Sequence, residues 1–207
     1  MDRKNIVREG YNKVASQYLA MRNEDLEEMS YLPEFCSLLP EGGRVLDAGC
    51  GGGIPFTKYL SDAFEVIGID ISETQIKLAK KNVPKAQFFI KDMTQLDFPD
   101  NYFDGILAYY SIIHIPREEQ EGLFKNLFRM LKPNGVALFS LHSTDDPETI
   151  YNDFFGEEMF WSGFDAETNL DILKKIGFKI IWSKFVSDSL SEDSNHLFVL
   201  LQKSLQK

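Results

Sequence analysis

Five short apolar runs alternate with helix-length segments along the first two thirds of the chain. The runs are rich in β-branched and aromatic residues, as buried strands are. Strands that alternate with helices are typical of a parallel sheet covered by helices on both faces. The pattern therefore predicts an α/β fold with strands over 44–49, 64–70, 86–92, 103–110 and 135–142.

Residues with fixed conformational preferences mark several boundaries between these elements. Ser72 and Gln75 have the spacing of a capping box, which starts a helix. Pro55 suits the first turn of another helix, because its ring fixes a helical φ. The stretch KPNG (132–135) predicts a turn directly before the fifth strand. These boundaries agree with the alternation of strands and helices.

The last third of the chain follows a different pattern. A loop over 143–160 and a helix over 165–176 are expected first. Two further strands, over 178–186 and 196–203, are then joined by only nine residues. Because that connection is too short for a crossover helix, the two strands should pair antiparallel. The prediction is a doubly wound, mostly parallel seven-stranded sheet with an antiparallel C-terminal hairpin.

Composition limits the function classes that the chain can serve. Its 207 residues, 43% hydrophobic and 26% charged, are typical of one globular domain. A formal net charge of −10 argues against nucleic-acid partners, which need clustered Lys and Arg. No apolar leader and no run of about 20 apolar residues is present, so we expect a cytoplasmic protein without a membrane span. Cys36 and Cys50 lack metal-ligand spacing, so no metal site is expected.

A glycine-rich loop follows the first strand and predicts a ligand site. From Asp47 to Gly53 it reads D-x-G-x-G-x-G, which places an acid at the strand end and bare backbone beside it. Counted from Gly49, a dinucleotide fingerprint needs a third glycine where Ile54 stands, and no G-K-[ST] follows for a nucleoside triphosphate. Asp70 ends the second strand about 20 residues further on, where an acid can accept both hydroxyls of a ribose.

Several motifs stand in the order and spacing of one enzyme family. They are VLDAGCGGG, VIGIDIS, KDMTQLDFPDNYFDGILA, HIP and RMLKPNGVALFS. With them the chain resembles the class I S-adenosylmethionine-dependent methyltransferases, and most of all the small-molecule branch that includes the quinone-biosynthesis enzymes. The resemblance implies a Rossmann-like methyltransferase fold, S-adenosyl-L-methionine as cofactor and S-adenosyl-L-homocysteine as product. YYSIIH stands where methyltransferases acting on nucleic acid or glutamine have N-P-P-[YF], which further disfavours a nucleic-acid substrate.

The glycine loop and the resemblance together imply a set of cofactor-binding residues. Ile71 and Met93 would sandwich the adenine, and Asp92 would accept from its amino group. Tyr11 and Tyr18 would close over the methionine end, although their spacing of seven also fits a core stripe of a helix. The full set is Tyr11, Tyr18, Asp47, Gly49, Gly51, Gly53, Asp70, Ile71, Asp92, Met93, Ala108 and Tyr109.

The three histidines of the chain are candidates for the acceptor side. His114 and His142 follow the fourth and fifth strands, and His196 begins an antiparallel strand, so all three should lie at the same edge of the sheet. His142 or His196 could act as a general base, which only a protonated acceptor needs. His114 could contact the substrate. The alternative, that each is a hydrogen-bonded structural histidine, stays open.

The aromatic-rich segment FFGEEMFWSGF (154–164) supplies two further candidates. Phe160 and Trp161 would line the acceptor site, which suits an apolar or aromatic small molecule. The alternative is a helix that packs on the core. We therefore divide the single domain into a helical lid over 1–43, a cofactor-binding core over 44–142 and an acceptor side over 143–207.

Methyl transfer to a small molecule is the activity that these features favour. The task of the protein is then to align donor and acceptor in a dry site, because the cofactor's methyl group is already activated. A protein that binds the cofactor without transferring methyl is an alternative from another class. An NAD-dependent oxidoreductase is weakened by Ile54. The sequence predicts neither the identity of the acceptor nor the oligomeric state.

Overall fold

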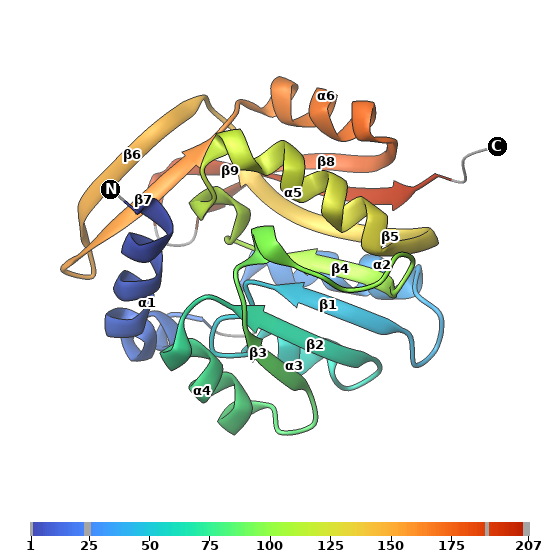
Figure 1. Cartoon of the computed structure of the whole chain (residues 1–207), viewed down its shortest axis with the longest axis horizontal. Coiled ribbons are helices and arrows are strands. Elements are labelled where there is room, and N and C mark those ends of the chain that lie inside the picture. Colours follow the sequence, from blue (N-terminus) through green and yellow to red (C-terminus); the bar gives the residue numbers. More distant parts are fainter. Residues whose placement is uncertain (1, 23–25, 189–190, 205–207) are drawn as a thin grey trace.

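A seven-stranded sheet forms the centre of the molecule in the computed structural model, which describes residues 2–22, 26–188 and 191–204 (Figure 1). Its strands are β1 Arg44–Ala48, β2 Glu65–Asp70, β3 Gln87–Ile90, β4 Phe103–Ala108, β5 Leu131–His142, β8 Phe178–Asp188 and β9 Ser191–Lys203. They lie in the order β3-β2-β1-β4-β5-β9-β8. The first five are parallel, and β9 runs antiparallel to both β5 and β8. The predicted fold class is confirmed.

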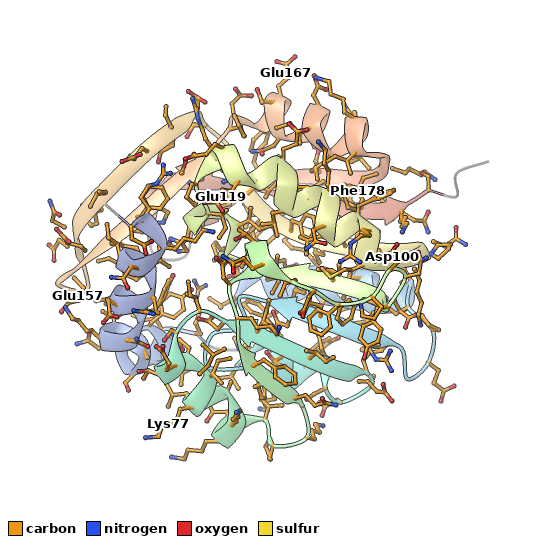
Figure 2. The ribbon with its side chains drawn as sticks, in the orientation of Figure 1. Lys77, Asp100, Glu119, Glu157, Glu167 and Phe178 are labelled. Carbon is orange, nitrogen blue, oxygen red and sulfur yellow. The ribbon has the colours of Figure 1, made fainter. Side chains whose placement is uncertain are left out.

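Helices cover both faces of this sheet because its central strands are apolar on both sides. In β1, Val45 and Leu46 are fully buried in two different core clusters. One cluster includes residues of α5 and α6, and the other includes residues of α2 and α3. Charged side chains such as Lys77 and Glu167 point outward (Figure 2). The helices are α1 Arg3–Ala20, α2 Leu32–Ser37, α3 Phe56–Leu60, α4 Glu73–Asn82, α5 Arg117–Met130 and α6 Ala166–Ile176.

The C-terminal hairpin is longer than predicted. β8 extends to Asp188 and β9 begins at Ser191, so most of the expected connection is strand. Residues 189–190 lie outside the described part of the chain. The long antiparallel pairing places His196 of β9 directly opposite His142 of β5.

A second hairpin occupies the segment that the sequence predicted as a loop, and that prediction was wrong. Its strands are β6 Asp146–Phe154 and β7 Glu157–Gly163, which pair antiparallel with each other outside the main sheet. The turn residues, Phe155 and Gly156, have φ angles of 54° and 86°. Two-residue turns with both φ angles positive usually have the sequence Asn-Gly or Asp-Gly. Here Phe takes the first position, so the usual signal is missing.

Helix α1 spans the carboxyl edge of the sheet between α4 and the β6–β7 hairpin (Figure 1). It starts at Arg3, because the side chain of Asp2 accepts a hydrogen bond from the Asn5 N–H and caps the helix. Asn12 Oδ1 accepts from the Ser72 hydroxyl (2.7 Å) at the start of α4. Lys13 pairs with Glu157 of β7 (2.7 Å). No helix of the described residues is long and apolar enough to cross a membrane.

Candidate functional site

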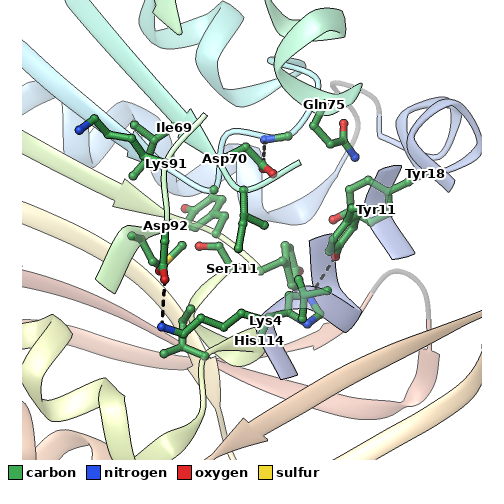
Figure 3. Close-up of a pocket in the computed structure, with 18 residues that line it drawn as sticks. Lys4, Tyr11, Tyr18, Ile69, Asp70, Gln75, Lys91, Asp92, Ser111 and His114 are labelled. Carbon is green, nitrogen blue, oxygen red and sulfur yellow. Dashed lines mark hydrogen bonds and ion pairs between the residues drawn. The ribbon is translucent and has the colours of Figure 1, made fainter. Parts of the chain in front are cut away.

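A cavity lies at the carboxyl ends of the parallel strands, beneath α1 (Figure 3). We call it the glycine-loop cavity, because Gly49 and Gly51 form part of its wall. A crevice outside the carboxyl ends of strands is where open α/β sheets bind their ligands. Nine residues predicted to bind cofactor line it: Tyr11, Tyr18, Gly49, Gly51, Asp70, Ile71, Asp92, Met93 and Tyr109.

Gly49 occupies a position that only glycine fits. Its φ angle is +89°, and an added Cβ would lie 2.2 Å from the Cβ of Ser111. The Gly49 N–H donates to the Ile69 carbonyl (2.8 Å), which ties the loop to β2. The Ser111 hydroxyl donates to the Ala48 carbonyl (2.7 Å) and fixes the opposite side. The loop therefore presents bare backbone to the cavity.

Asp70 is held in place by backbone donors at the end of β2. Its Oδ2 accepts from the Gly51 N–H (3.0 Å) and its Oδ1 from the Ser72 N–H (2.9 Å). Burial raises the pKa of this carboxyl to about 6, although these backbone hydrogen bonds oppose the shift. When it is ionised, the carboxylate is a fixed acceptor on the cavity wall.

Gln75 is a cavity residue that the sequence assigned only to a capping box. The box is half formed: the Gln75 N–H donates to the Ser72 hydroxyl (3.1 Å), but Asp70 takes the Ser72 N–H that the glutamine would otherwise bind. The Gln75 side chain is 1% exposed, and its Oε1 and Nε2 have no hydrogen-bond partner among the described residues. A buried amide left without partners is destabilising, so its place in the cavity wall indicates a ligand.

Asp92 has a partner that the sequence did not predict. Its Oδ1 accepts from the Thr94 N–H (2.9 Å), and its Oδ2 accepts from Lys4 Nζ (3.0 Å) of α1 (Figure 3). Burial raises the pKa of Asp92, but the hydrogen bonds from Thr94 and Lys4 together hold it below its usual value. Lys4 thus ties the start of α1 to the wall where the adenine is expected.

Three predicted cofactor residues are absent from the residues that line this cavity. Asp47 is buried and its Oδ2 accepts from the Thr57 hydroxyl (2.5 Å); burial raises its pKa to about 7. Gly53, at φ +82°, lies against α4, where an added Cβ would be 3.2 Å from the Ala79 Cα. Ala108 is fully buried at the end of β4. These three support the walls of the cavity from behind.

A second cavity adjoins the first along α1, which contributes Tyr11 and Tyr18 to both. We call it the histidine cavity, because all three histidines line it. Of the two predicted substrate residues in this segment, Trp161 lines the cavity, whereas Phe160 is fully buried in a core cluster. The two cavities meet: both are lined by Tyr11, Tyr18, Tyr110 and His114.

His114 joins the lid to the base of the histidine cavity. Its Nδ1 donates to the Phe160 carbonyl (2.7 Å), since a carbonyl only accepts, and this leaves Nε2 to accept from the Tyr11 hydroxyl (2.9 Å; Figure 3). Burial lowers the pKa of His114 to about 4. The imidazole is therefore neutral at neutral pH, and both of its nitrogens are in use.

His142 and His196 face each other across β5 and β9 with ring centroids 6.4 Å apart. Burial lowers the pKa of His142, so it too is neutral at neutral pH. Its Nε2 is buried and has no hydrogen-bond partner among the described residues. Within the described ranges, no group of three or more His, Cys, Asp or Glu side chains is arranged to hold a metal ion.

Comparisons with known proteins agree with this geometry. The profile of a family described as "Methyltransferase domain" matches residues 45–135. Phosphoethanolamine N-methyltransferase 1 of Arabidopsis thaliana is 29% identical over 94% of this chain and 37% of its own length. Sterol 24-C-methyltransferase erg6 of Aspergillus fumigatus is 35% identical over 53% of this chain and 32% of its own length. The chain spans about a third to two thirds of the length of the first curated relatives it matches.

Solved structures show the same fold. A SAM-dependent methyltransferase from Methanosarcina mazei superposes with a TM-score of 0.74 at 22% identity, covering 84% of this chain and 98% of that one. The 1,6-didemethyltoxoflavin-N1-methyltransferase of Burkholderia thailandensis, solved with S-adenosylhomocysteine, gives a TM-score of 0.64 at 18% identity, covering 96% and 91%.

Proposed function

We propose that the chain is a class I S-adenosylmethionine-dependent methyltransferase and that it transfers the methyl group of S-adenosylmethionine to a small-molecule acceptor; the matching methyltransferase-domain profile and the methyltransferase relatives support this. The observation that carries this proposal is the pair of cavities that share Tyr11, Tyr18, Tyr110 and His114. A donor in one cavity and an acceptor in the other would meet at these four side chains. In-line transfer needs that proximity more than it needs any acid or base.

The glycine-loop cavity fits the cofactor chemically. Asp70 would accept the ribose hydroxyls, Asp92 would bind the adenine amino group, and Gln75 would gain the partners that it lacks. The bare backbone at Gly49 lets a ligand approach where a Cβ would collide with Ser111. When bound, the cofactor supplies an activated methyl group on a sulfonium. The chain's own residues hold and enclose it.

The histidine cavity would hold the acceptor between aromatic rings. Tyr11, Phe154, Trp161 and Tyr151 form a chain of ring contacts with centroids 5.5–6.1 Å apart. Such a wall suits a small organic molecule. The relatives named for phosphoethanolamine and sterol support a small-molecule acceptor for this chain as well. The quinone-biosynthesis branch, the division into lid, core and acceptor side, and a cytoplasmic location stay predictions.

Calorimetric titration tests the cofactor, and a screen of small-molecule acceptors with methyl-labelled S-adenosylmethionine tests the reaction. We expect binding of S-adenosylmethionine and S-adenosylhomocysteine but not of NAD, and label in an acceptor with matching release of S-adenosylhomocysteine. Binding of NAD without the other two would overturn the proposal. Cofactor binding with no transfer to any acceptor in a broad screen would instead favour a binding protein.

For an acceptor that must lose a proton, we propose His142 as the base, because this residue lines the histidine cavity and its Nε2 has no hydrogen-bond partner among the described residues. A base works when it is deprotonated, so the rate holds at high pH and falls as pH drops through the pKa. Since burial lowers that pKa, the fall should come below the ordinary value of about 6.5. His142→Gln should lower turnover about 10²-fold and leave S-adenosylhomocysteine binding unchanged. If His142→Gln and His196→Gln both keep full turnover, neither histidine is the base, and catalysis rests on the alignment of the methyl donor with the acceptor.

A further inference from the structure

Arg22 is a buried arginine in the wall of the histidine cavity. It follows the end of α1 and is only 8% exposed. Its guanidinium lies 4.7 Å from the ring centroid of Tyr18 and 4.6 Å from that of Tyr110, and all three residues line the cavity. The two rings stack on the guanidinium and restrict its orientation, as cation–π contacts do.

Among the described residues, two side chains make polar contacts with the guanidinium, each through one of its nitrogens. Nη1 lies 3.3 Å from Glu28 Oε1, which is a single long contact, and Nη2 donates to the Tyr18 hydroxyl (2.5 Å). An arginine carries five N–H donors in a planar fork, which is best satisfied by two parallel bonds to one oxyanion. The pairing with Glu28 lacks that bidentate form.

The remaining charges of the cavity leave Arg22 as its basic anchor. Histidines apart, it is the sole basic side chain among the described residues that line the cavity, and burial keeps His114 and His142 neutral. Glu28, which pairs with Arg22, is 1% exposed and is not among the described residues that line the cavity. The acid in the wall, Asp146, accepts a hydrogen bond from the Thr149 hydroxyl (2.9 Å).

We propose that the acceptor carries an oxyanion, a carboxylate or a phosphate, which docks on the guanidinium of Arg22. This inference rests on the proposed function and names the chemistry of its acceptor. An anionic group docked on the edge of this guanidinium, beside Tyr18 and Tyr110, would fix one end of the acceptor close to the side chains shared by the two cavities. Arg22 is then the residue that sets specificity for charge.

Matched pairs of small molecules test the proposal on protein saturated with S-adenosylhomocysteine. The carboxylate arm compares 4-hydroxyphenylacetate with 4-hydroxyphenylacetamide, and the phosphate arm compares phosphoethanolamine with ethanolamine. Calorimetry should show the charged member of at least one pair binding about tenfold or more tightly, because hydrogen bonds between charged groups are strong. Arg22→Gln should abolish that preference and leave the affinity for S-adenosylhomocysteine within about twofold.

A second variant separates anion recognition from a purely structural role. Glu28→Gln removes the carboxylate that competes for Arg22, so it should strengthen binding of the charged probe. If Arg22 only fastens α1, both variants should weaken every probe alike. No preference in the wild-type protein, including no binding of any probe, or a preference that survives in Arg22→Gln, overturns the proposal. If the wild-type protein does not bind S-adenosylhomocysteine at all, the proposed function itself is overturned.

Discussion

At the scale of single residues, Asp70 shows how one site balances opposing effects. Two backbone N–H groups stabilise its ionised form, while burial in a closed cavity favours the neutral form. Burial dominates in the protein without cofactor, which places the pKa at about 6. The carboxyl therefore titrates just below neutral pH, in a range where binding can be measured.

Affinity for S-adenosylhomocysteine should fall as pH is lowered from 8 to 5. The ionised carboxylate would accept hydrogen bonds from both ribose hydroxyls, and protonation would remove one of these acceptors. With a pKa of about 6 in the free protein, about a tenth of Asp70 is ionised at pH 5, so affinity should drop about tenfold. Asp70→Asn should bind weakly at pH 8 and show a flat profile in the same titrations. A slope that persists in this variant would assign the titration to another group, such as Asp47.

Gln75→Leu should separate binding from stability. It removes two unpartnered buried polar atoms, so the free energy of unfolding without cofactor should rise by about 1 kcal/mol. Cofactor affinity should fall about tenfold, because the ligand loses its hydrogen bonds to the amide. Chemical denaturation and calorimetry measure the two effects.

The matched control for this variant is Gln120, whose buried Nε2 donates to the carbonyls of Ile112, Ile115 and Ser162. Gln120→Leu should lower the free energy of unfolding by about 1–3 kcal/mol, because those carbonyls lose a donor. Equal destabilisation by the two substitutions would show that Gln75 has partners in the free protein.

The sequence identified those site residues whose roles depend on local backbone. Gly49 and Asp70 follow strand ends at a fixed spacing, and both line the glycine-loop cavity. Gln75, Lys4 and Arg22 were missed because their roles depend on distant contacts. Gln75 faces the cavity only because Asp70 has taken its capping partner, and Lys4 reaches Asp92 only when α1 lies across the sheet. Contact of any of these with a cofactor or acceptor remains a prediction.

At the scale of elements, α1 and the β6–β7 hairpin depend on each other. Gly10 lies where the helix comes closest to β7: an added Cβ would be 2.8 Å from the Glu158 carbonyl oxygen and 2.9 Å from the Met159 Cε. A glycine inside a helix is normally less stable than alanine by about 1 kcal/mol. Here the close approach explains why the smaller residue fits.

Gly10→Ala should loosen the lid although Gly10 lines neither cavity. The backbone carbonyl cannot yield, so α1 must shift away from β7, at a cost of about 1–3 kcal/mol. Tyr11 and Tyr18 would move with it, and affinity for S-adenosylhomocysteine should fall about tenfold by calorimetry. Ser16→Ala, on the exposed side of the same helix, should leave affinity unchanged. Unchanged affinity in Gly10→Ala would show that the lid position does not govern cofactor binding.

The elements that the sequence predicted correctly are those with strong periodic signals. The five parallel strands are apolar on both faces, so each was found within a few positions. The turn predicted over 132–135 was wrong as a boundary, because β5 begins at Leu131 and includes these residues. The β6–β7 hairpin was missed because β6 is mostly exposed and its turn uses Phe155 at positive φ. Apolar and polar residues alternate only weakly along β6, and its turn lacks the usual residues, so the local sequence pattern predicts a loop.

At the scale of the whole molecule, cofactor binding should stabilise the fold. S-adenosylhomocysteine at 100 times its Kd should add about 2.7 kcal/mol. For a chain of this length that corresponds to a rise of about 5–11 °C in Tm, measured by differential scanning calorimetry. NAD at the same concentration should leave Tm unchanged. An equal rise with NAD would contradict the assignment of the glycine-loop cavity.

The β6–β7 hairpin has a consequence for how such proteins diversify. Its two strands pair with each other and with no strand of the main sheet, yet they supply Thr149, Tyr151, Phe154 and Trp161 to the histidine cavity. None of the described residues lining the glycine-loop cavity comes from this hairpin. Strand β7 is nevertheless tied to the other half of the molecule, because His114 donates to the Phe160 carbonyl and Gly10 of α1 packs on Glu158 and Met159. Strand β6 is mostly exposed, so after gene duplication selection could reshape its side chains toward a new acceptor with less effect on the proposed cofactor site than changes in β7 would have.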